Sequence, residues 1–481
     1  MRAAILPPAV ACILAACAAG PDFVPPAAPG AERFTTEALP DVALEAAPAA
    51  GAPSDWWSVF GSPDLDEAVR AALAGNRSLR IAQASLVRAR ALDEAGRSAR
   101  LPQATLEASN GRSKYGAAFL GPMELAPFTY YSVGANVSYL LDFSGGVRRT
   151  IEARHALAEA GQYELEAAHL SLTGNVVLQA LAIASARAQL RAAEAVLEED
   201  RRNLELVREA LQEGSAARVD LLGAESQLAQ DQTLLPPLRQ ELSAARHALA
   251  VLEGQPPGNR VPRDFDLEDF RQPASLLLSV PSELAHRRPD IRASEARLHA
   301  AIAEVGIATA NLYPQVRLTG SLSQQALTTS GLFERGSAAW TLIGNLSAPL
   351  FDGGRLRAER RAARAAAREA LARYEQTVLT AFGQVADVLA ALQHDAEQEA
   401  AQQRALEVAE SSLALARASY EAGNTGLLQI LDAERLVQRA RIGVARSRAR
   451  RLQDTAELIV ALSGHSPAAS DGTEAPARVQ R

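Results

Sequence analysis

The sequence contains few cysteines, few aromatic residues and no concentrated charge of either sign. Only two of its 481 residues are cysteines and 5% are aromatic, whereas 48% are hydrophobic, with alanine the dominant type. This composition suits long helices that pack at close range better than a thick globular core. The net charge of −7 is mild and is not clustered, so the sequence shows no basic surface for nucleic acid.

Sites for enzymatic chemistry are also missing from the sequence. Its seven histidines are scattered, without an HxxxH spacing or a carboxylate pairing typical of a metal site. The glycine pairs of "SGGVRRT" and "DGGRLR" lack the lysine and serine of a P-loop, and "SGHS" lacks the context of a nucleophile elbow. We therefore expect no enzyme activity, no metal and no cofactor beyond the covalent lipid considered next.

The N-terminus "MRAAILPPAVACILAAC" has the pattern of a secretory signal peptide over residues 1–16. Its apolar core is too short to span a bilayer, and the small residues before Cys17 resemble the lipobox of bacterial lipoproteins. Cys17 would then become the lipidated first residue, and Ala18 after it favours the outer membrane by analogy. Cys12 would leave with the signal, so the mature chain could form no internal disulfide. An ordinary signal peptide with a chance cysteine is the alternative.

The chain is an internal duplication. Three separate blocks of sequence recur in the same order with offsets of 212, 209 and 209 residues. The first repeat covers residues 61–253, the second covers 284–464, and residues 254–283 join them. The equivalent positions are Pro102 and Pro314, Gly145 and Gly354, Gly214 and Gly423, and Glu225 and Glu434.

Each repeat contains two segments in which apolar and polar residues alternate strictly. The alternation predicts strands at about 102–115, 129–142, 314–326 and 338–350, each near the length that a tilted strand needs to cross a bilayer. A soluble sandwich would alternate as well. However, 11 of the 22 aromatic residues fall within 101–145 and 313–351, near the strand ends. That placement favours the interfacial girdles of an outer-membrane barrel.

Four strands are too few to close a transmembrane barrel, because the smallest such barrels have about eight. The open edges must therefore be shared between protomers. Three protomers would give a twelve-stranded barrel with a lumen, and two would give a nearly plugged one. The residues alone permit both.

The helical segments supply a check on length. The proline-free runs 149–213 and 355–422 would each extend about 100 Å at roughly 1.5 Å per residue. The returning runs 216–253 and 427–463 are shorter. Stacked end to end on 286–311 and 76–100, respectively, they match the long runs in length. This predicts a cylinder of antiparallel helices whose returning members are interrupted. Pro236 and Pro237 should kink one returning helix or start a new turn.

Three segments have the composition of low-order structure. Residues 17–60 form an extended, lipidated leader, and the linker 254–283 is rich in proline and acid. We expect these segments, which interrupt the returning helices, to form a belt around the middle of the cylinder. The tail 465–481 is predicted to be disordered.

Five motifs follow one another along the chain: "CAAGPDFVPP", "DWWSVFGSPDLDEAV", "RPDIRASEARLHAAIAEVGIATANLYPQV", "PLFDGGRLRAERRAA" and "SYEAGNTGLLQILDAERLVQRAR". These motifs resemble the outer membrane efflux factors of the TolC and OprM type, most closely their NodT-like lipoprotein branch. The resemblance implies an α+β membrane protein, a homotrimer with a twelve-stranded β-barrel in the outer membrane and a periplasmic helical barrel. It also implies partners, namely a periplasmic adaptor (membrane fusion protein) and an inner-membrane pump, often of the resistance-nodulation-division class.

The resemblance places an aperture just after the second helical tip. Leu428 and Asp432 would point inward one helical turn apart, with Arg435 beside Asp432. Gln429 stands where some relatives have a second aspartate, so this chain departs from a double acid ring. An acid ring in a narrow passage would attract cations and repel its own copies. The alternative is a solvated helix acid that pairs with Arg435.

Two further positions follow from the resemblance. Asp220 and Tyr420 match a pair that links neighbouring hairpins in the closed state, although Thr425 replaces the arginine that completes this latch in some relatives. Gly214 and Gly423 would end the long helices at the tips, where the family docks its adaptor.

We therefore expect a passive export duct for small molecules such as drugs and toxic compounds. It would be lipid-anchored in the outer membrane and extend into the periplasm. The alternative is a periplasmic coiled-coil scaffold or adaptor lipoprotein without a pore. Adaptors lack paired alternating hairpins with a polar face, and a porin has no use for the long helices. The exported substrates cannot be read from the sequence.

Overall fold

The computed structural model describes residues 19–27, 33–35, 43–46, 55–114, 126–259, 263–273, 275–278 and 281–462. It divides into two compact units. The sheet unit contains residues 1–26, 85–162 and 293–375, and the hairpin unit contains residues 27–84, 163–292 and 376–481. Cys17 and the tail 465–481 lie outside the described residues.

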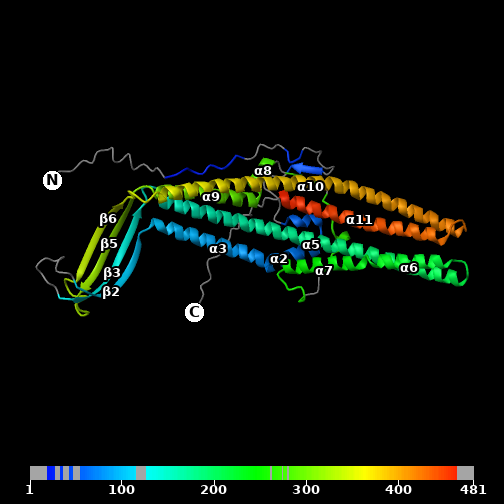
Figure 1. The fold of residues 1–481 in the computed structure, drawn as a ribbon, viewed down its shortest axis with the longest axis horizontal. Helices are drawn as coiled ribbons and strands as arrows, with labels where there is room; N and C mark the ends of the chain where they lie inside the picture. Colours follow the sequence, from blue (N-terminus) through cyan, green and yellow to red (C-terminus); the bar gives the residue numbers. More distant parts are fainter. Residues whose placement is uncertain are drawn as a thin grey trace. The chain divides into compact units, whose positions relative to one another are not determined.

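The sheet unit carries one antiparallel sheet of four strands in the order β2-β3-β5-β6 (Figure 1). The strands are β2 (Gln103–Ser113), β3 (Phe128–Leu141), β5 (Gln315–Ala326) and β6 (Ala338–Ser347). Their bounds differ from the predicted ones by three residues or fewer. Within the described residues, β2 and β6 are edge strands with one paired side each.

The register sorts the side chains of the sheet into two opposite faces. Residues directly opposite in an antiparallel pair point to the same face. One row across the four strands is apolar and consists of Leu106, Ala135, Leu322 and Trp340. The next row is polar and consists of Thr105, Asn136, Ser321 and Thr341. Apolar and polar rows therefore alternate along the strands as the sequence predicted.

Both faces of this sheet are uncovered in the protomer. On the apolar face Leu106 is 80% exposed, Trp340 75% and Leu322 61%. On the polar face the hydroxyl groups of Ser321 and Thr341 lie 2.5 Å apart in a hydrogen bond. A sandwich buries one face of each sheet. This sheet instead leaves large apolar side chains without cover.

Two long helices leave the sheet through capped corners. α5 (Gly146–Gln212) follows β3, and α10 (Arg355–Glu421) follows β6; each has 67 residues, or about 100 Å. The carboxylate of Asp142 accepts hydrogen bonds from the amides of Val147 and Arg148 at 3.0 and 2.8 Å. Asp352 does the same for α10 at 2.8 Å. These caps satisfy the free amides of each first turn. The shorter helices α3 (Arg77–Arg97) and α9 (Pro289–Ala310) precede β2 and β5.

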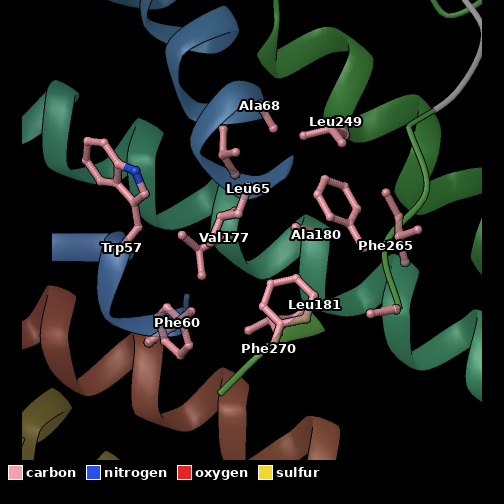
Figure 2. Close-up of a cluster of buried hydrophobic side chains, with 14 of the residues drawn as sticks. Trp57, Phe60, Leu65, Ala68, Val177, Ala180, Leu181, Leu249, Phe265 and Phe270 are labelled. Carbon is pink, nitrogen blue, oxygen red and sulfur yellow. The ribbon is translucent and has the colours of Figure 1, made fainter. Parts of the chain in front are cut away.

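The core of the hairpin unit forms around α5 and α2 (Pro63–Gly75) (Figure 2). The "DWWSVF" stretch, predicted as the end of an extended leader, forms a 3-10 helix, η1 (Trp56–Phe60). Trp56 donates to the Thr173 hydroxyl at 3.2 Å, and Phe60 is fully buried. The aromatic side chains therefore turn this segment into core.

The linker between the repeats also departs from the expected low order. Phe265 and Phe270 are 1% exposed and pack in the same core around η3 (Leu267–Asp269). Beyond η3, β4 (Ser275–Leu278) pairs in parallel with β1 (Ala43–Ala46) of the leader. The two segments predicted as irregular thus pair with each other.

The returning helices of the two repeats differ in continuity. The first is split into α6 (Arg218–Gln232) and α7 (Leu235–Leu252), with Pro236 and Pro237 in the first turn of α7. Proline lacks an amide hydrogen and is tolerated there, so the pair starts a new helix. The second, α11 (Leu427–Leu462), is continuous. α8 (Pro281–Arg287) completes the unit.

One described helix, α5, contains an 18-residue window apolar enough to cross a membrane, with a mean hydropathy of 1.4. Half of this window is buried inside the structure. Val177, Ala180 and Leu181 of α5 are fully buried in the core of the hairpin unit. Packing inside the protein therefore accounts for this apolar stretch.

Candidate functional site

The two helical tips of the hairpin unit share one turn geometry. Gly214 ends α5 with φ 75°, and Gly423 ends α10 with φ 73°. Glycine adopts this left-handed conformation without steric cost. A Cβ at either position would meet no atom within 4 Å, so the backbone angle alone requires glycine. The equivalent hydrogen bonds run from the Ser215 amide to the Ala210 carbonyl (2.8 Å) and from the Asn424 amide to the Ser419 carbonyl (2.9 Å).

An ion pair also recurs in both helical hairpins, the first formed by α5 and α6 and the second by α10 and α11. Arg208 on α5 pairs with Glu225 on α6 at 3.4 Å, and Arg417 on α10 pairs with Glu434 on α11 at 2.7 Å. Both members of the second pair lie 209 positions after those of the first. The duplication seen in the sequence is therefore repeated in side-chain contacts.

The residues predicted for the aperture begin the second returning helix. The Asp432 carboxylate lies 3.0 Å from the Arg435 guanidinium, and its side chain is 71% exposed. Gln429 is exposed as well, whereas the side chain of Leu428 lies outside the described residues. This exposed pair is compatible both with an aperture and with an ordinary surface ion pair.

The two residues predicted to form a latch do not contact each other in the protomer. Asp220 accepts a hydrogen bond from the Ala217 amide at 2.9 Å and so helps to cap α6. Tyr420 lies on the last turn of α10 and is 45% exposed. Between these two described residues the structure contains no hydrogen bond.

A pair of acids near the first tip was missed by the sequence reasoning. Asp200 on α5 is half-buried and lies against Asp231 on α6, which is 8% exposed. Burial, followed by the nearby charge of Asp231, raises the pKa of Asp200 to about 7. The Asp200 carboxyl therefore gains and loses its proton near neutral pH, because burial and an adjacent carboxylate disfavour its charged form.

A second buried acid pair lies between α10 and α11. Asp395 is 7% exposed and Asp454 is 1% exposed. Burial and the hydrogen bond to Asp395 raise the pKa of Asp454 to about 7, while Arg450, 3.1 Å away, opposes the shift. Burial also raises the pKa of the neighbouring Glu457, with Asp454 as the second cause.

In the sheet unit, the chain just after the predicted lipidation site is held against the first turns of α5. The Ala19 amide donates to the Ser144 carbonyl at 2.9 Å. The Arg149 guanidinium, itself buried, lies 2.5 Å from the Asp22 carboxylate. Cys17 lies outside the described residues, two positions before Ala19. Residues 19–22 are thus fixed at the corner between β3 and α5.

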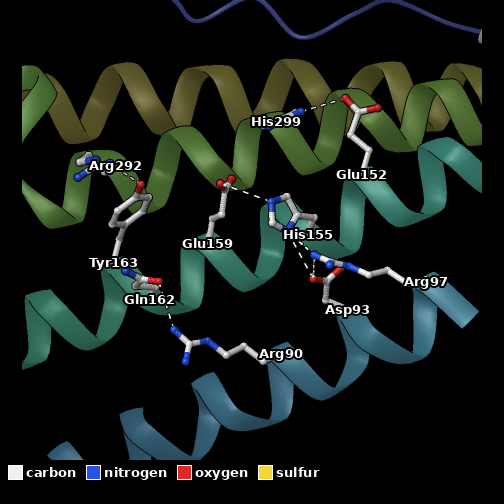
Figure 3. A network of polar contacts seen from close by, with 10 residues as sticks. All are labelled: Arg90, Asp93, Arg97, Glu152, His155, Glu159, Gln162, Tyr163, Arg292 and His299. Atoms are coloured by element: carbon white, nitrogen blue, oxygen red, sulfur yellow. Dashed lines mark hydrogen bonds and ion pairs between the residues drawn. The ribbon is translucent and has the colours of Figure 1, made fainter. Parts of the chain in front are cut away.

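Polar contacts connect α5 with both of its neighbours in the sheet unit (Figure 3). His155 on α5 lies 3.4 Å from Asp93 on α3. Glu152 on α5 lies 2.9 Å from His299 on α9. The His299 ring stacks on Phe23 with centroids 4.3 Å apart. Residues 19–23 therefore pack on the same contact that joins α5 to α9.

The "RPD" motif joins α8, α9 and the end of α11 in the hairpin unit. Arg288 donates to Asp290 at 2.7 Å, to Gln384 at 2.9 Å and to the Ala461 carbonyl at 3.2 Å. It borders a cavity of about 480 Å³ lined by α5, α10 and α11. Among the described residues no group of three or more His, Cys, Asp or Glu side chains could hold a metal ion.

The family model for outer membrane efflux proteins matches residues 68–255 and again residues 280–464. These two matches correspond to the two repeats. The pyoverdine export outer membrane protein OpmQ of Pseudomonas aeruginosa is 32% identical over 414 residues, which cover 85% of this chain and 87% of that protein. Nodulation protein T of Rhizobium leguminosarum bv. trifolii is 28% identical over 477 residues, 96% of this chain and 97% of that protein.

A solved structure gives the same result for the fold. The outer-membrane channel OprN superposes with a TM-score of 0.82 at 31% identity, over 93% of this chain and 99% of that one. The predicted resemblance to this family of channels is confirmed.

Proposed function

Because the chain belongs to the outer membrane efflux protein family, we propose that three copies form a lipid-anchored duct that passes small molecules from an inner-membrane pump to the outside. The chain is an outer membrane efflux channel of the tripartite kind and extends into the periplasm. The trimer, the pump class and the lipid anchor are the proposed refinements.

The two-faced open sheet carries this proposal. An exposed apolar row that includes Trp340 and Leu106 suits contact with lipid acyl chains, and the polar row suits a water-filled lumen. The edges β2 and β6 each have a free side within the described residues. Three such sheets joined edge to edge would give twelve strands, enough for a lumen. A pore-free scaffold would have no use for these exposed apolar rows.

Residues 19–23 support lipidation at Cys17. The contacts of Ala19 and Asp22 hold the chain beside the corner where β3 ends. In a barrel that corner marks one membrane surface. A lipid on Cys17 would therefore enter the leaflet next to the strands.

The helical tips are the proposed contact with a periplasmic adaptor, centred on Gly214 and Gly423. We assign the aperture to Leu428, Gln429, Asp432 and Arg435. The latch between Asp220 and Tyr420 would form between neighbouring copies. Members of this family work with an adaptor and an inner-membrane pump in tripartite systems. In our proposal the pump is of the resistance-nodulation-division class and delivers drugs and toxic compounds to the duct.

Planar-bilayer conductance of protein purified from outer membranes tests the proposal. We expect stable channels, and native mass spectrometry should find three chains per particle. Asp432→Ala should lower the preference for cations, with Glu407→Ala, an exposed acid on α10, as the matched control. A wild-type protein that never conducts would favour the scaffold. Equal ion selectivity in the wild type and Asp432→Ala would remove Asp432 from the aperture.

A further inference from the structure

Two acids at the first hairpin are connected to the proposed aperture through a short chain of contacts. Gln227 on α6 hydrogen-bonds to Asp231 and, through its side-chain carbonyl, accepts from Arg435 at 3.4 Å. Asp231 in turn lies against Asp200 on α5. Arg435 also pairs with Asp432 at 3.0 Å. The Arg435 guanidinium therefore lies between the exposed Asp432 and the Asp200–Asp231 pair.

The other charged groups around the pair are already engaged. Glu434 on α11 is 9% exposed and accepts from Arg417 at 2.7 Å and from Asn203 at 3.3 Å. Its negative charge acts on Asp200, and the positive charge of Arg435 opposes it. The Arg435 Nε atom is buried without a hydrogen-bond partner. Arg435 is thus a cation with unused donor capacity next to the acids.

The duplication shows that packing does not require acids at these positions. The residues equivalent to Asp200 and Asp231, 209 positions later, are Ala409 and Ala440. Both alanines are 8% exposed in the second hairpin. Where one repeat places two carboxyl groups, one half-buried and one buried, the other buries two methyl groups. The acid pair is therefore a feature added to an interface that alanine fills.

The charge of such a pair changes in one step. While the two carboxyl groups share a proton, the pair carries one negative charge, and after the proton leaves it carries two. The second charge strengthens the attraction on Arg435 in a partly buried setting, where charges act over short distances with little screening. The exposed Asp432 competes for the same guanidinium from a position open to water.

We propose that the Asp200–Asp231 pair is a proton-controlled switch that determines whether Arg435 neutralises Asp432. With the proton in place, Arg435 stays with Asp432 and the aperture acid is masked. Without it, Arg435 turns towards the pair through the Gln227 contact, and Asp432 faces the passage unpaired. The proposal rests on the proposed function, because Asp432 matters to transport only if it borders a passage. Asp200 and Asp231 act as positioning residues.

Ion selectivity measured as a function of pH tests the switch in full-length, lipidated protein in planar bilayers. In the wild type, the permeability ratio of potassium to chloride should rise about two- to fivefold between pH 6 and 8, the range of a surface ion pair. The double substitution Asp200→Asn with Asp231→Asn should abolish the step and hold the ratio at its low-pH value. Arg435→Gln should hold the ratio high at both pH values.

Two further variants control for folding and for general loosening of the helices. Asp200→Ala with Asp231→Ala copies the alanine pair of the second hairpin and should fold, yet also lack the step. Asp395→Asn with Asp454→Asn removes the other buried pair, which has no contact with Arg435 among the described residues, and should keep the step.

The outcomes separate this inference from the proposed function. Channels with a pH step that survives both Asp200–Asp231 double substitutions would overturn the switch and leave the duct intact. Loss of the step in the Asp395–Asp454 variant would also overturn it, because the effect would then come from any buried acid pair. A wild type without channels at every pH would instead overturn the duct.

Discussion

The two hairpins share their framework but differ in their interiors. Both have a left-handed glycine at the tip and an arginine–glutamate pair across the helices. Only the first has acids between its helices at Asp200 and Asp231, and only the second at Asp395 and Asp454. The counterparts of the latter two are Ala186 and Ala245, both buried. The shared contacts therefore define the architecture, and each acid pair is present in one hairpin only.

The Asp395–Asp454 pair, whose counterparts in the first hairpin are alanines, should have the largest effect of the three comparisons. The folded state raises the pKa of Asp454 from 3.8 to about 7, so between these values the folded chain binds more protons than the unfolded chain. The contribution of this pair to stability then falls as pH rises through this window, by an amount on the order of a few kcal/mol. Thermal unfolding midpoints at pH 4 to 7 should show this fall.

The double substitution Asp395→Ala with Asp454→Ala should reduce that pH dependence to the share contributed by Asp200, whose pKa is also raised to about 7, because it copies the alanine pair of the first hairpin. Glu407→Ala, an exposed acid on the same helix, should leave the dependence unchanged. A slope in the double variant equal to that of the wild type would show that other groups cause it.

The repeated ion pair should contribute unequally to the two hairpins. Arg417→Ala leaves Glu434, 9% exposed, beside other buried acids with one charged hydrogen bond fewer. We expect a loss of about 2–3 kcal/mol in the free energy of unfolding. Arg208→Ala breaks the equivalent pair, whose side chains are 43% and 44% exposed, and should cost at most about 1 kcal/mol. Denaturant titration of both variants measures this difference, and equal losses would contradict the role assigned to burial.

Local patterns in the sequence predict the framework because they depend on near neighbours. Strict alternation located the four strands, and the duplication located Gly214 and Gly423. The proline pair Pro236–Pro237 predicted a kink or the start of a new turn, and a separate helix begins there. Each of these signals is contained within a few residues or in the comparison of two halves of one chain.

The acid pairs and the contacts between distant segments could not be predicted from the same patterns. Alanine occurs on both buried and exposed faces of a helix, so an alanine-rich helix does not reveal which face Asp200 or Asp454 occupies. The burial of Phe265 and Phe270 and the pairing of β1 with β4 depend on contacts between segments far apart in the chain. One signal was available, namely acids in one repeat aligned with alanines in the other.

The tips should respond alike to loss of glycine, with the smallest effect of the three comparisons. Gly214→Ala and Gly423→Ala each force an alanine into φ near 75° or 73°, at about 1 kcal/mol. Neither Cβ would meet an atom within 4 Å, and the same is true of the mid-helix Gly223. Gly223→Ala should therefore stabilise α6 by up to about 1 kcal/mol, because glycine is the poorer helix former. Unfolding midpoints should move down for both tip variants and up for Gly223→Ala. Different losses at the two tips would mean that one of them has contacts in the assembled protein that the other lacks.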